Sequence, residues 1–212
     1  ARAVLDGEIG QDILAKFDDV GLHGLAWGEQ GFRHITNNRN PIHTPADVEG
    51  LKIRTMENPV HLSAFNAMGA APTPMAWPEV ISSLQQGVID GQENPLSVIV
   101  SVKLDEVQKY LTLSGHVYSP AMLLVSRSFW DGLDDTQKAA FEKAADEAVV
   151  AMRGFVDDVE TGGVETLKER GMEVNELSAE EKSEFQASIQ SAYDGYYDTY
   201  GKDFVDSIVN FE

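Results

Sequence analysis

The sequence predicts an α/β protein with more than one lobe and a long helical tail. Up to about residue 130, short apolar stretches alternate with helical patterns, which favours strands and helices packed in layers. Turn residues interrupt two extended stretches, near 29–31 and 119–120, and each interruption suits a strand that passes between lobes. From about residue 133 onward the pattern is helical.

The first elements are a helix and two extended runs. Apolar residues recur at helical spacing over 4–20, and Gly21 fits a helix C-cap. Residues 22–28 and 32–37 are predicted to form two short strands, separated at 29–31.

Short strands and helices continue to residue 126. Residues 51–53 predict a strand, and 58–68, 78–86 and 95–105 predict helical stretches, the first two beginning near prolines. Residues 109–118 and 121–126 favour strands, with a break at Ser119–Pro120.

A long amphipathic helix opens the last part of the chain. Asp134 and Gln137 predict its N-terminal cap, its apolar pattern covers about 136 to 161 and reaches towards Arg170, and Gly162–Gly163 predicts a kink. A capping box at Ser178 predicts a further helix that runs to about residue 197. These helices would wrap or brace the sheet.

The charge of the chain restricts its partners. Its 212 residues carry a formal net charge of −19, and most of the acidic excess lies after Asp131. A nucleic-acid-binding protein needs a continuous basic face, so that class is excluded. A small anion must be attracted by specific arginines, because the overall field repels it.

Composition narrows the chemistry further. Cysteine is absent, which excludes disulfides, thiol catalysis and thiolate metal sites. No window approaches eighteen apolar residues, so no membrane span is predicted. The chain has neither an initiator Met nor a basic-then-apolar leader, and we expect it to be either mature or truncated.

Residues 50–95 place an arginine and an asparagine at the ends of two short strands. Arg54 follows the apolar strand 51–53, and Asn94 lies in the turn 90–95. The two side chains could converge on one small anion, which the planar guanidinium would hold through two donors. The local alternatives are a surface arginine paired with Glu57 and an asparagine that caps the following helix.

Two further residues are candidates for the same pocket. Arg33 stands in the extended run 32–37, where the alternative is a solvent-facing strand arginine. Trp77 precedes Pro78, so its ring either packs at a helix start or forms an apolar wall or a cation–π surface.

Catalytic and metal-binding patterns are missing from the sequence. The five histidines show no i,i+4 or HExxH spacing, and no GxSxG turn or phosphate-cradling loop occurs. This favours binding over catalysis, with neither a metal nor a cofactor. The alternative is an enzyme that uses Glu29, Glu93 or His116 as its acid or base.

Several motifs resemble those of a known family. The segments GLKIRTMENP, APTPMAW and above all LQQGVIDGQENPL are similar to those of the DctP-type solute-binding proteins of tripartite ATP-independent periplasmic (TRAP) transporters. The resemblance continues through EVQKYLTLSGHVYSPAMLLVSRSFWDGL into the long acidic helix and covers essentially the whole chain.

The resemblance implies a two-lobe, periplasmic-binding-protein-like α/β fold with a long inter-lobe helix and a helical C-terminal tail. Residues 1–31 and 121–212 would form lobe one with the brace helix and the C-terminal helices. Residues 32–120 would form lobe two, which carries the carboxylate clamp. Members of the family normally have roughly a hundred more residues before the helix at 4–20, so we expect lobe one to be incomplete.

The resemblance also implies roles for individual residues. Arg54 would pair with the carboxylate of the ligand, and Asn94 would support the same group. Arg33 would add a contact, Trp77 would line the pocket, and Tyr118 with its neighbour Ser119 would face the cleft.

The implied function is that of an extracytoplasmic receptor in the periplasm. It would close around a small organic acid, such as a C4-dicarboxylate or a sugar acid, and deliver it to a TRAP permease. We expect a monomer, with a dimer as the alternative, and no cofactor, nucleic acid or direct membrane insertion. The alternative functions are a receptor for ectoine-like compatible solutes, a periplasmic enzyme acting on a small carboxylate, and a ligand-sensing module of a signalling protein.

Overall fold

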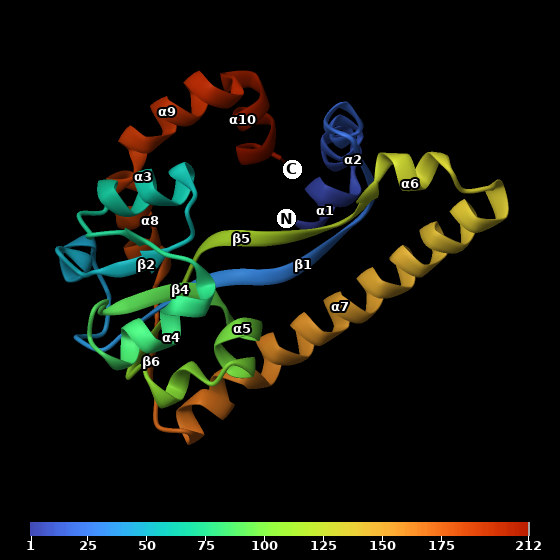
Figure 1. Ribbon diagram of the computed structural model, residues 1–212. Helices are drawn as coiled ribbons and strands as arrows, with labels where there is room; N and C mark the ends of the chain where they lie inside the picture. The colour runs from blue at the N-terminus through green and yellow to red at the C-terminus, as the bar shows by residue number, and fades with distance from the viewer. Residues whose placement is uncertain (212) are drawn as a thin grey trace.

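A six-stranded mixed sheet forms the body of the protein, whose computed structural model describes residues 1–211 (Figure 1). The strand order is β3-β2-β4-β1-β5-β6. β2 is parallel to β3 and β4, β1 is antiparallel to β4 and β5, and β6 is parallel to β5. The strands are β1 (Leu22–Asn37), β2 (Ile53–Thr55), β3 (Thr73–Pro74), β4 (Gly91–Pro95), β5 (Tyr110–Ser126) and β6 (Glu173–Glu176).

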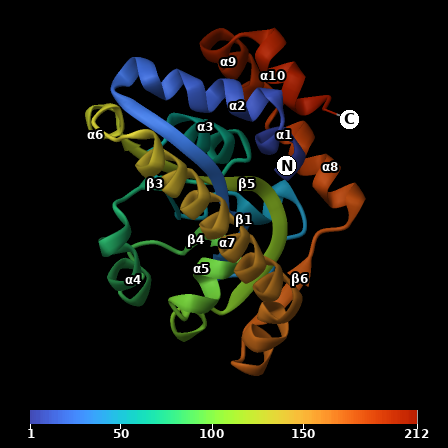
Figure 2. The same cartoon turned by 90° about the vertical axis from the view of Figure 1, so that its right-hand side faces the viewer.

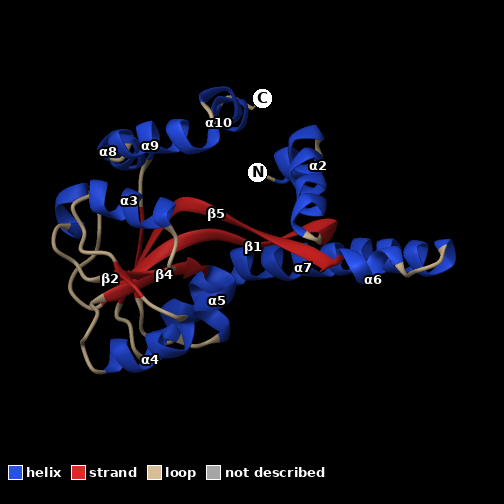
Figure 3. Cartoon of the chain, turned by 45° about the horizontal axis from the view of Figure 1, so that its top comes forward, coloured by secondary structure: helices blue, strands red, loops and turns tan. Residues whose placement is uncertain are grey.

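Helices cover both faces of this sheet, which confirms the predicted α/β class. On one face α3 and α8 pack on Ile35 and Ile53, and on the other α4, α5 and the end of α7 pack around Leu111 (Figure 3). The helices are α1 (Arg2–Asp6), α2 (Glu8–Ala15), α3 (Pro59–Ala67), α4 (Trp77–Gln85), α5 (Leu96–Ser101), α6 (Arg127–Asp131), α7 (Asp135–Glu169), α8 (Ala179–Ser188), α9 (Gln190–Tyr200) and α10 (Lys202–Val209), with 3-10 turns η1 (Lys16–Val20), η2 (Pro45–Val48) and η3 (Leu104–Glu106).

The paired strands β1 and β5 continue well beyond the other strands. They pair from Leu22 opposite Ser126 to Asn37 opposite Tyr110. At their far end α1 and α2 pack on β1, and a small separate core forms around Leu5, Leu14 and Trp27. Figure 2 shows α7 lying across these two strands. The strands therefore connect two cores.

The predicted strand breaks at 29–31 and 119–120 are wrong, because β1 and β5 each continue through them. The pairing register instead shifts between Glu29 and Gly31, where Gly31 has φ +101°. A non-glycine residue rarely adopts that angle, so the glycine marks a β-bulge and not a strand end.

The single helix expected over 4–20 is also wrong. The chain forms α1, α2 and the turn η1, and Gly7 separates the first two with an extended ψ of −171°. The expected C-cap at Gly21 is confirmed, with left-handed backbone at φ 80°.

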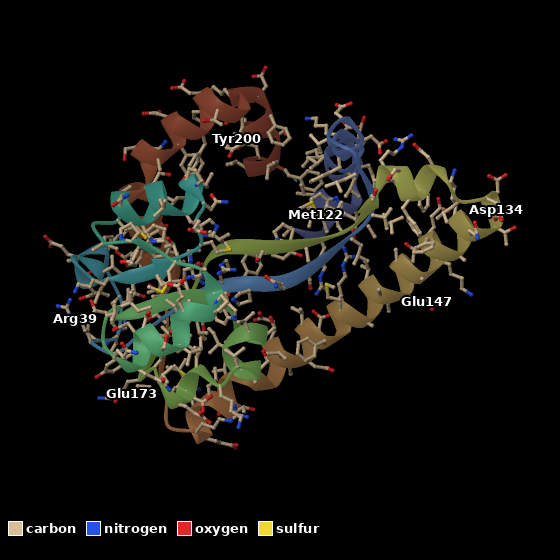
Figure 4. All side chains as sticks on the ribbon, viewed as in Figure 1. Arg39, Met122, Asp134, Glu147, Glu173 and Tyr200 are labelled. Carbon is tan, nitrogen blue, oxygen red and sulfur yellow. The ribbon has the colours of Figure 1, made fainter. Side chains whose placement is uncertain are left out.

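The helix α7 continues through Gly162–Gly163, where the sequence predicted a kink, and runs from Asp135 to Glu169. Gly163 is buried, and a Cβ there would lie 3.2 Å from Val100 of α5. The glycine therefore lets α7 approach α5 closely. In Figure 4 the labelled Asp134 stands at the N-terminal end of this helix and Glu147 lies along it.

The predicted boundary at residue 121 does not describe the packing of the C-terminal part. Leu167 shares a core with Leu111, and Leu177 and Phe185 share a core with Ile35. β6 also adds a strand to the sheet beside β5. Residues 167–185 thus belong to the same body as 32–120, because their apolar side chains cover its sheet.

The two neighbouring glycines of α7 give a matched test of this packing. Ala in place of helical Gly stabilises by roughly 1 kcal/mol through propensity alone. Gly162 faces open space, so Gly162→Ala should raise the free energy of unfolding by about that amount. Gly163→Ala would bring a Cβ within 2.9 Å of Val159 and 3.2 Å of Val100 on α5. The free energy of unfolding of this variant should therefore be at least about 1 kcal/mol lower than that of Gly162→Ala. Urea unfolding of both variants measures the difference, and equal gains would contradict the close contact.

Candidate functional site

The ends of β2, β3 and β4 meet at one edge of the sheet. Because β2 is parallel to both neighbours, their carboxyl ends lie at the same edge, the usual position for ligands in open α/β sheets. This edge carries Arg54 from β2, Met75 just after β3 and Asn94 from β4. The sequence separation of about forty residues between Arg54 and Asn94 is therefore bridged by strand pairing.

Arg54 is buried without a counterion. Its exposed fraction is 4%, and it forms no ion pair with residues 1–211. Nε and Nη2 donate to the carbonyl of Met75 at 2.9 and 2.7 Å, and the guanidinium carbon lies 5.6 Å from the ring centroid of Trp77. The alternative pairing with Glu57 is therefore wrong. Burial lowers the pKa of Arg54, and the nearby Glu93 only partly offsets this.

Arg33 is also buried, but its charge is neutralised inside the protein. Its exposed fraction is 2%, which overturns the solvent-facing alternative. Nε donates to Glu93 Oε2 at 2.5 Å and Nη2 to Glu93 Oε1 at 2.9 Å, a two-pronged ion pair. Nη2 also donates to Asn94 Oδ1 at 3.1 Å, while Nη1 has only a long contact of 3.4 Å with Ser119.

Glu93 is surrounded by nitrogen atoms. In addition to Arg33, His116 Nε2 lies 3.2 Å from Oε2 and His61 Nδ1 lies 3.7 Å from Oε1. Burial alone would raise the pKa of Glu93, but His116 and Arg33 outweigh burial and hold that pKa well below its ordinary value. Glu93 is therefore a permanent anion that fixes the position of Arg33.

A bulge in β5 brings His116 to this cluster. Arg33 pairs with Val117, but Ile35 pairs with Thr112, so β5 has several more residues than β1 in this interval. Gly115, with φ +56°, lies in the extra segment. Strand bulges redirect side chains in this way.

Asn94 does not cap α5, whose N-cap is Pro95. Its Nδ2 donates to Gln92 Oε1 at 2.5 Å, and its Oδ1 accepts from Arg33. One Nδ2 hydrogen is left for another acceptor, since an amide nitrogen carries two donors.

Trp77 and Tyr118 have different surroundings. Trp77 begins α4 with 37% of its surface exposed, and its ring lies beside Arg54. Tyr118 donates a short hydrogen bond to Glu29, which also binds Arg2, and burial raises the pKa of this tyrosine. The structure thus brings Trp77 to Arg54, and places Tyr118 in a separate network between β1, β5 and α1.

The sequence did not identify the partner of Arg33 or the role of His61. The sequence suggests Glu93 only as a catalytic acid or base, although this residue stands next to Asn94 in the same motif. The usable signal was a carboxylate inside an otherwise buried strand, because a buried charge is normally paired.

Within residues 1–211, no cluster of three or more His, Cys, Asp and Glu side chains is arranged to hold a metal ion. The helices in this range also include none with the length and apolarity needed to span a bilayer.

The chain is similar to known solute-binding proteins along its length. The family described as "Bacterial extracellular solute-binding protein, family 7" matches residues 1–199. A solute-binding protein of Verminephrobacter eiseniae is 46% identical over 208 residues, which make up 98% of this chain and 62% of that protein. This chain thus spans less than two thirds of that curated relative.

Solved structures give the same result for the fold. A TRAP periplasmic solute-binding protein from Bordetella bronchispeptica, whose ligand density is interpreted as pantoate, is 56% identical with a TM-score of 0.94, covering 100% of this chain and 69% of that chain. A TRAP periplasmic solute-binding protein from Polaromonas sp. JS666 bound to D-erythronate is 48% identical with a TM-score of 0.93, covering 98% of this chain and 68% of that chain.

Removal of the Glu93 charge should destabilise the protein strongly. Glu93→Gln leaves the Arg33 guanidinium buried without a counterion, so we expect a loss of about 3–5 kcal/mol in the free energy of unfolding. The double variant Arg33→Met/Glu93→Gln should recover part of this loss. Glu57→Gln, on the exposed surface, should stay within about 0.5 kcal/mol of wild type. Urea unfolding of the intact protein measures these free energies. A loss below about 1 kcal/mol in Glu93→Gln would contradict the buried ion pair.

His34 should make the stability depend on pH. Its Nδ1 accepts from the Gly115 amide at 3.1 Å, and burial, with the nearby His116 and Lys182 charges, lowers the pKa of His34 to about 3. The unfolded chain takes up this proton near pH 6.5 and the folded protein does not, so stability should fall as pH drops below about 6.5. In His34→Asn, which keeps an acceptor for Gly115, this dependence should be weaker by up to about 1.4 kcal/mol per pH unit. Parallel pH profiles for both proteins would contradict a buried neutral imidazole.

Proposed function

Because the chain belongs to the family of bacterial extracellular solute-binding proteins, family 7, we propose that the protein is an extracytoplasmic receptor for small organic acids that serves a TRAP permease. The two similar structures described above are TRAP periplasmic solute-binding proteins with pantoate and D-erythronate as ligands. They support a periplasmic location and a carboxylate ligand.

The uncompensated charge of Arg54 carries this proposal. A buried ion without a partner costs several kcal/mol, and an anionic ligand would remove that cost. Two of its nitrogens are held by the Met75 carbonyl, and Nη1 has no hydrogen bond to residues 1–211. The guanidinium of Arg54 is therefore oriented before a ligand binds, which reduces the entropy lost on binding. Asn94 would donate its remaining Nδ2 hydrogen to the same carboxylate.

The ligand is proposed to carry one carboxylate and several hydroxyl groups. A second arginine with a free charge would suit a second anionic or hydroxyl-bearing end of the ligand, but Glu93 already neutralises Arg33. One free guanidinium therefore favours a monocarboxylate over a C4-dicarboxylate. Pantoate and D-erythronate are both hydroxylated monocarboxylates, which supports the same chemistry.

The alternatives find less support in the geometry. A receptor for ectoine-like solutes would use the Trp77 ring for the ligand cation, but Arg54 already lies over this ring. An enzyme using Glu93 as an acid is disfavoured, because Arg33 and His116 hold that carboxyl ionised. Glu29 is similarly bound by Arg2 and Tyr118.

Substitutions of Arg54 test the clamp. Each charge-assisted hydrogen bond contributes roughly 1.5–3 kcal/mol, so Arg54→Ala should weaken binding of D-erythronate or pantoate by more than about tenfold. Arg54→Lys keeps the charge but loses the planar fork, and should also weaken binding by about tenfold or more. Titration calorimetry on the intact protein measures both affinities.

Arg39→Ala is the matched control. Arg39 is exposed, lies just beyond the end of β1 at the left side of Figure 4, and its Nη1 lies 3.8 Å from Asp90 Oδ2. Its removal should leave ligand affinity within about twofold of wild type. Unchanged affinity in Arg54→Ala would overturn the clamp, and turnover of the bound acid would favour the enzyme alternative.

A further inference from the structure

A cavity of about 340 Å³ lies on the face of the sheet covered by α3, α8 and α9. Its floor is the sheet at Ile35 and the bulge of β5, and its walls are the three helices. An engineered apolar cavity of about 150 Å³ holds benzene, so this volume admits a ring with a short chain. None of Arg54, Asn94 and Trp77 lines it, so the cavity is distinct from the clamp.

The walls of the cavity are held in place. The hydroxyl of Tyr196 on α9 donates to the carbonyl of Val60 at 2.9 Å and lies 3.1 Å from Ser63 Oγ. These bonds connect α9 to α3 beside the cavity. Most of the lining is apolar or aromatic, including Ile42, Ala64, Phe65, Met68, Phe185 and Ile189. Such a lining favours a hydrocarbon or an aromatic ring.

One end of the cavity contains two imidazoles. His61 lines the cavity with an exposed fraction of 9%, and its buried Nδ1 forms no hydrogen bond within residues 1–211 but lies 3.7 Å from Glu93 Oε1. His116 lines the same end, with its ring edge-to-face against Phe65 at 5.5 Å. Both imidazoles touch Glu93, so this end adjoins the cluster that holds Arg33.

The mouth of the cavity carries an unpaired cation. Lys182 on α8 is exposed, lines the cavity, and forms no hydrogen bond or ion pair with residues 1–211. Glu160 and Glu176 line a neighbouring hollow with Lys182, but neither pairs with it. In a chain with a net charge of −19, a free lysine over an apolar cavity is complementary to a small amphiphilic anion.

We propose that this cavity is a second binding site, for a small aromatic or branched-chain carboxylic acid. The hydrocarbon part lies between Phe65 and Phe185, and the carboxylate meets Lys182 at the mouth. The site differs from the clamp in chemistry as well as position: the clamp holds its anion by a buried guanidinium, and the cavity holds a hydrocarbon by apolar contact.

Calorimetry of the intact protein with 3-phenylpropionate tests this. We expect saturable binding with a Kd below about 1 mM. Propionate, which lacks the ring, and 3-phenylpropanamide, which lacks the charge, should each bind at least about fivefold more weakly. Titration with D-erythronate present in excess should leave the binding of 3-phenylpropionate measurable.

Three variants locate the site. Ala64→Leu fills part of the cavity and should weaken binding of 3-phenylpropionate by about tenfold or more, whereas Ala187→Leu, on the exposed side of α8, should leave it unchanged. Lys182→Gln, on the surface, should weaken binding of 3-phenylpropionate severalfold without affecting the fold. If Ala64→Leu does not fold, this variant alone tests whether the probe binds in the cavity. Arg54→Ala should keep this binding while losing that of D-erythronate.

The proposal is overturned by an absence of saturable binding at about 5 mM probe. It is equally overturned if Ala64→Leu and Lys182→Gln both bind 3-phenylpropionate as wild type does. Loss of 3-phenylpropionate binding in Arg54→Ala would place the probe in the clamp, which would reject the second site and leave the proposed receptor function intact.

Discussion

Two arginines lie buried at the same sheet edge, and the difference between their partners decides what this edge can bind. Arg33 meets a carboxylate in a two-pronged ion pair, while Arg54 meets only a carbonyl and an aromatic ring. A buried charge with a counterion is a structural element, and one without a counterion attracts an anion. The sheet edge thus combines one cation that is paired inside the protein and one that is not, with Asn94 bonded to the first.

The fold creates this asymmetry through strand pairing. Successive side chains of β4 point to opposite faces of the sheet. Gln92 lies opposite Arg54 in the register, and Glu93 lies opposite Ile35. Glu93 therefore faces the side of α3, where Arg33, His61 and His116 surround it. Asn94 faces the other side, where Arg33 can still reach its oxygen at the end of the strand. One short motif in this way supplies both the counterion of Arg33 and the amide that we propose for ligand binding.

The sequence placed Arg54 and Asn94 near strand ends, as the structure does, but it missed the ion pair of Arg33. Arg54 follows a short apolar strand, and Asn94 precedes a proline, so both strand ends could be read locally. The ion pair of Arg33 could not, because Glu93 is 60 residues away and the match depends on register. Tyr118 illustrates the same limit: bulges near Gly31 shift the pairing, and a shift of one residue reverses the face of a strand side chain. The glycine pair of α7 suggested a kink because the sequence does not show that α5 lies against it.

Arg33 lies in an irregular part of β1, and its two-pronged ion pair with Glu93 fixes its position there. The register of β1 against β5 shifts on both sides of this residue, between Glu29 and Gly31 and again between Arg33 and Ile35. A regular ladder would fix the backbone through repeated hydrogen bonds, but bulges interrupt that pattern. Glu93 lies on β4, which pairs regularly with β1 from Arg33 to Asn37. The ion pair therefore anchors the part of β1 whose register against β5 is irregular to β4, with which β1 pairs regularly.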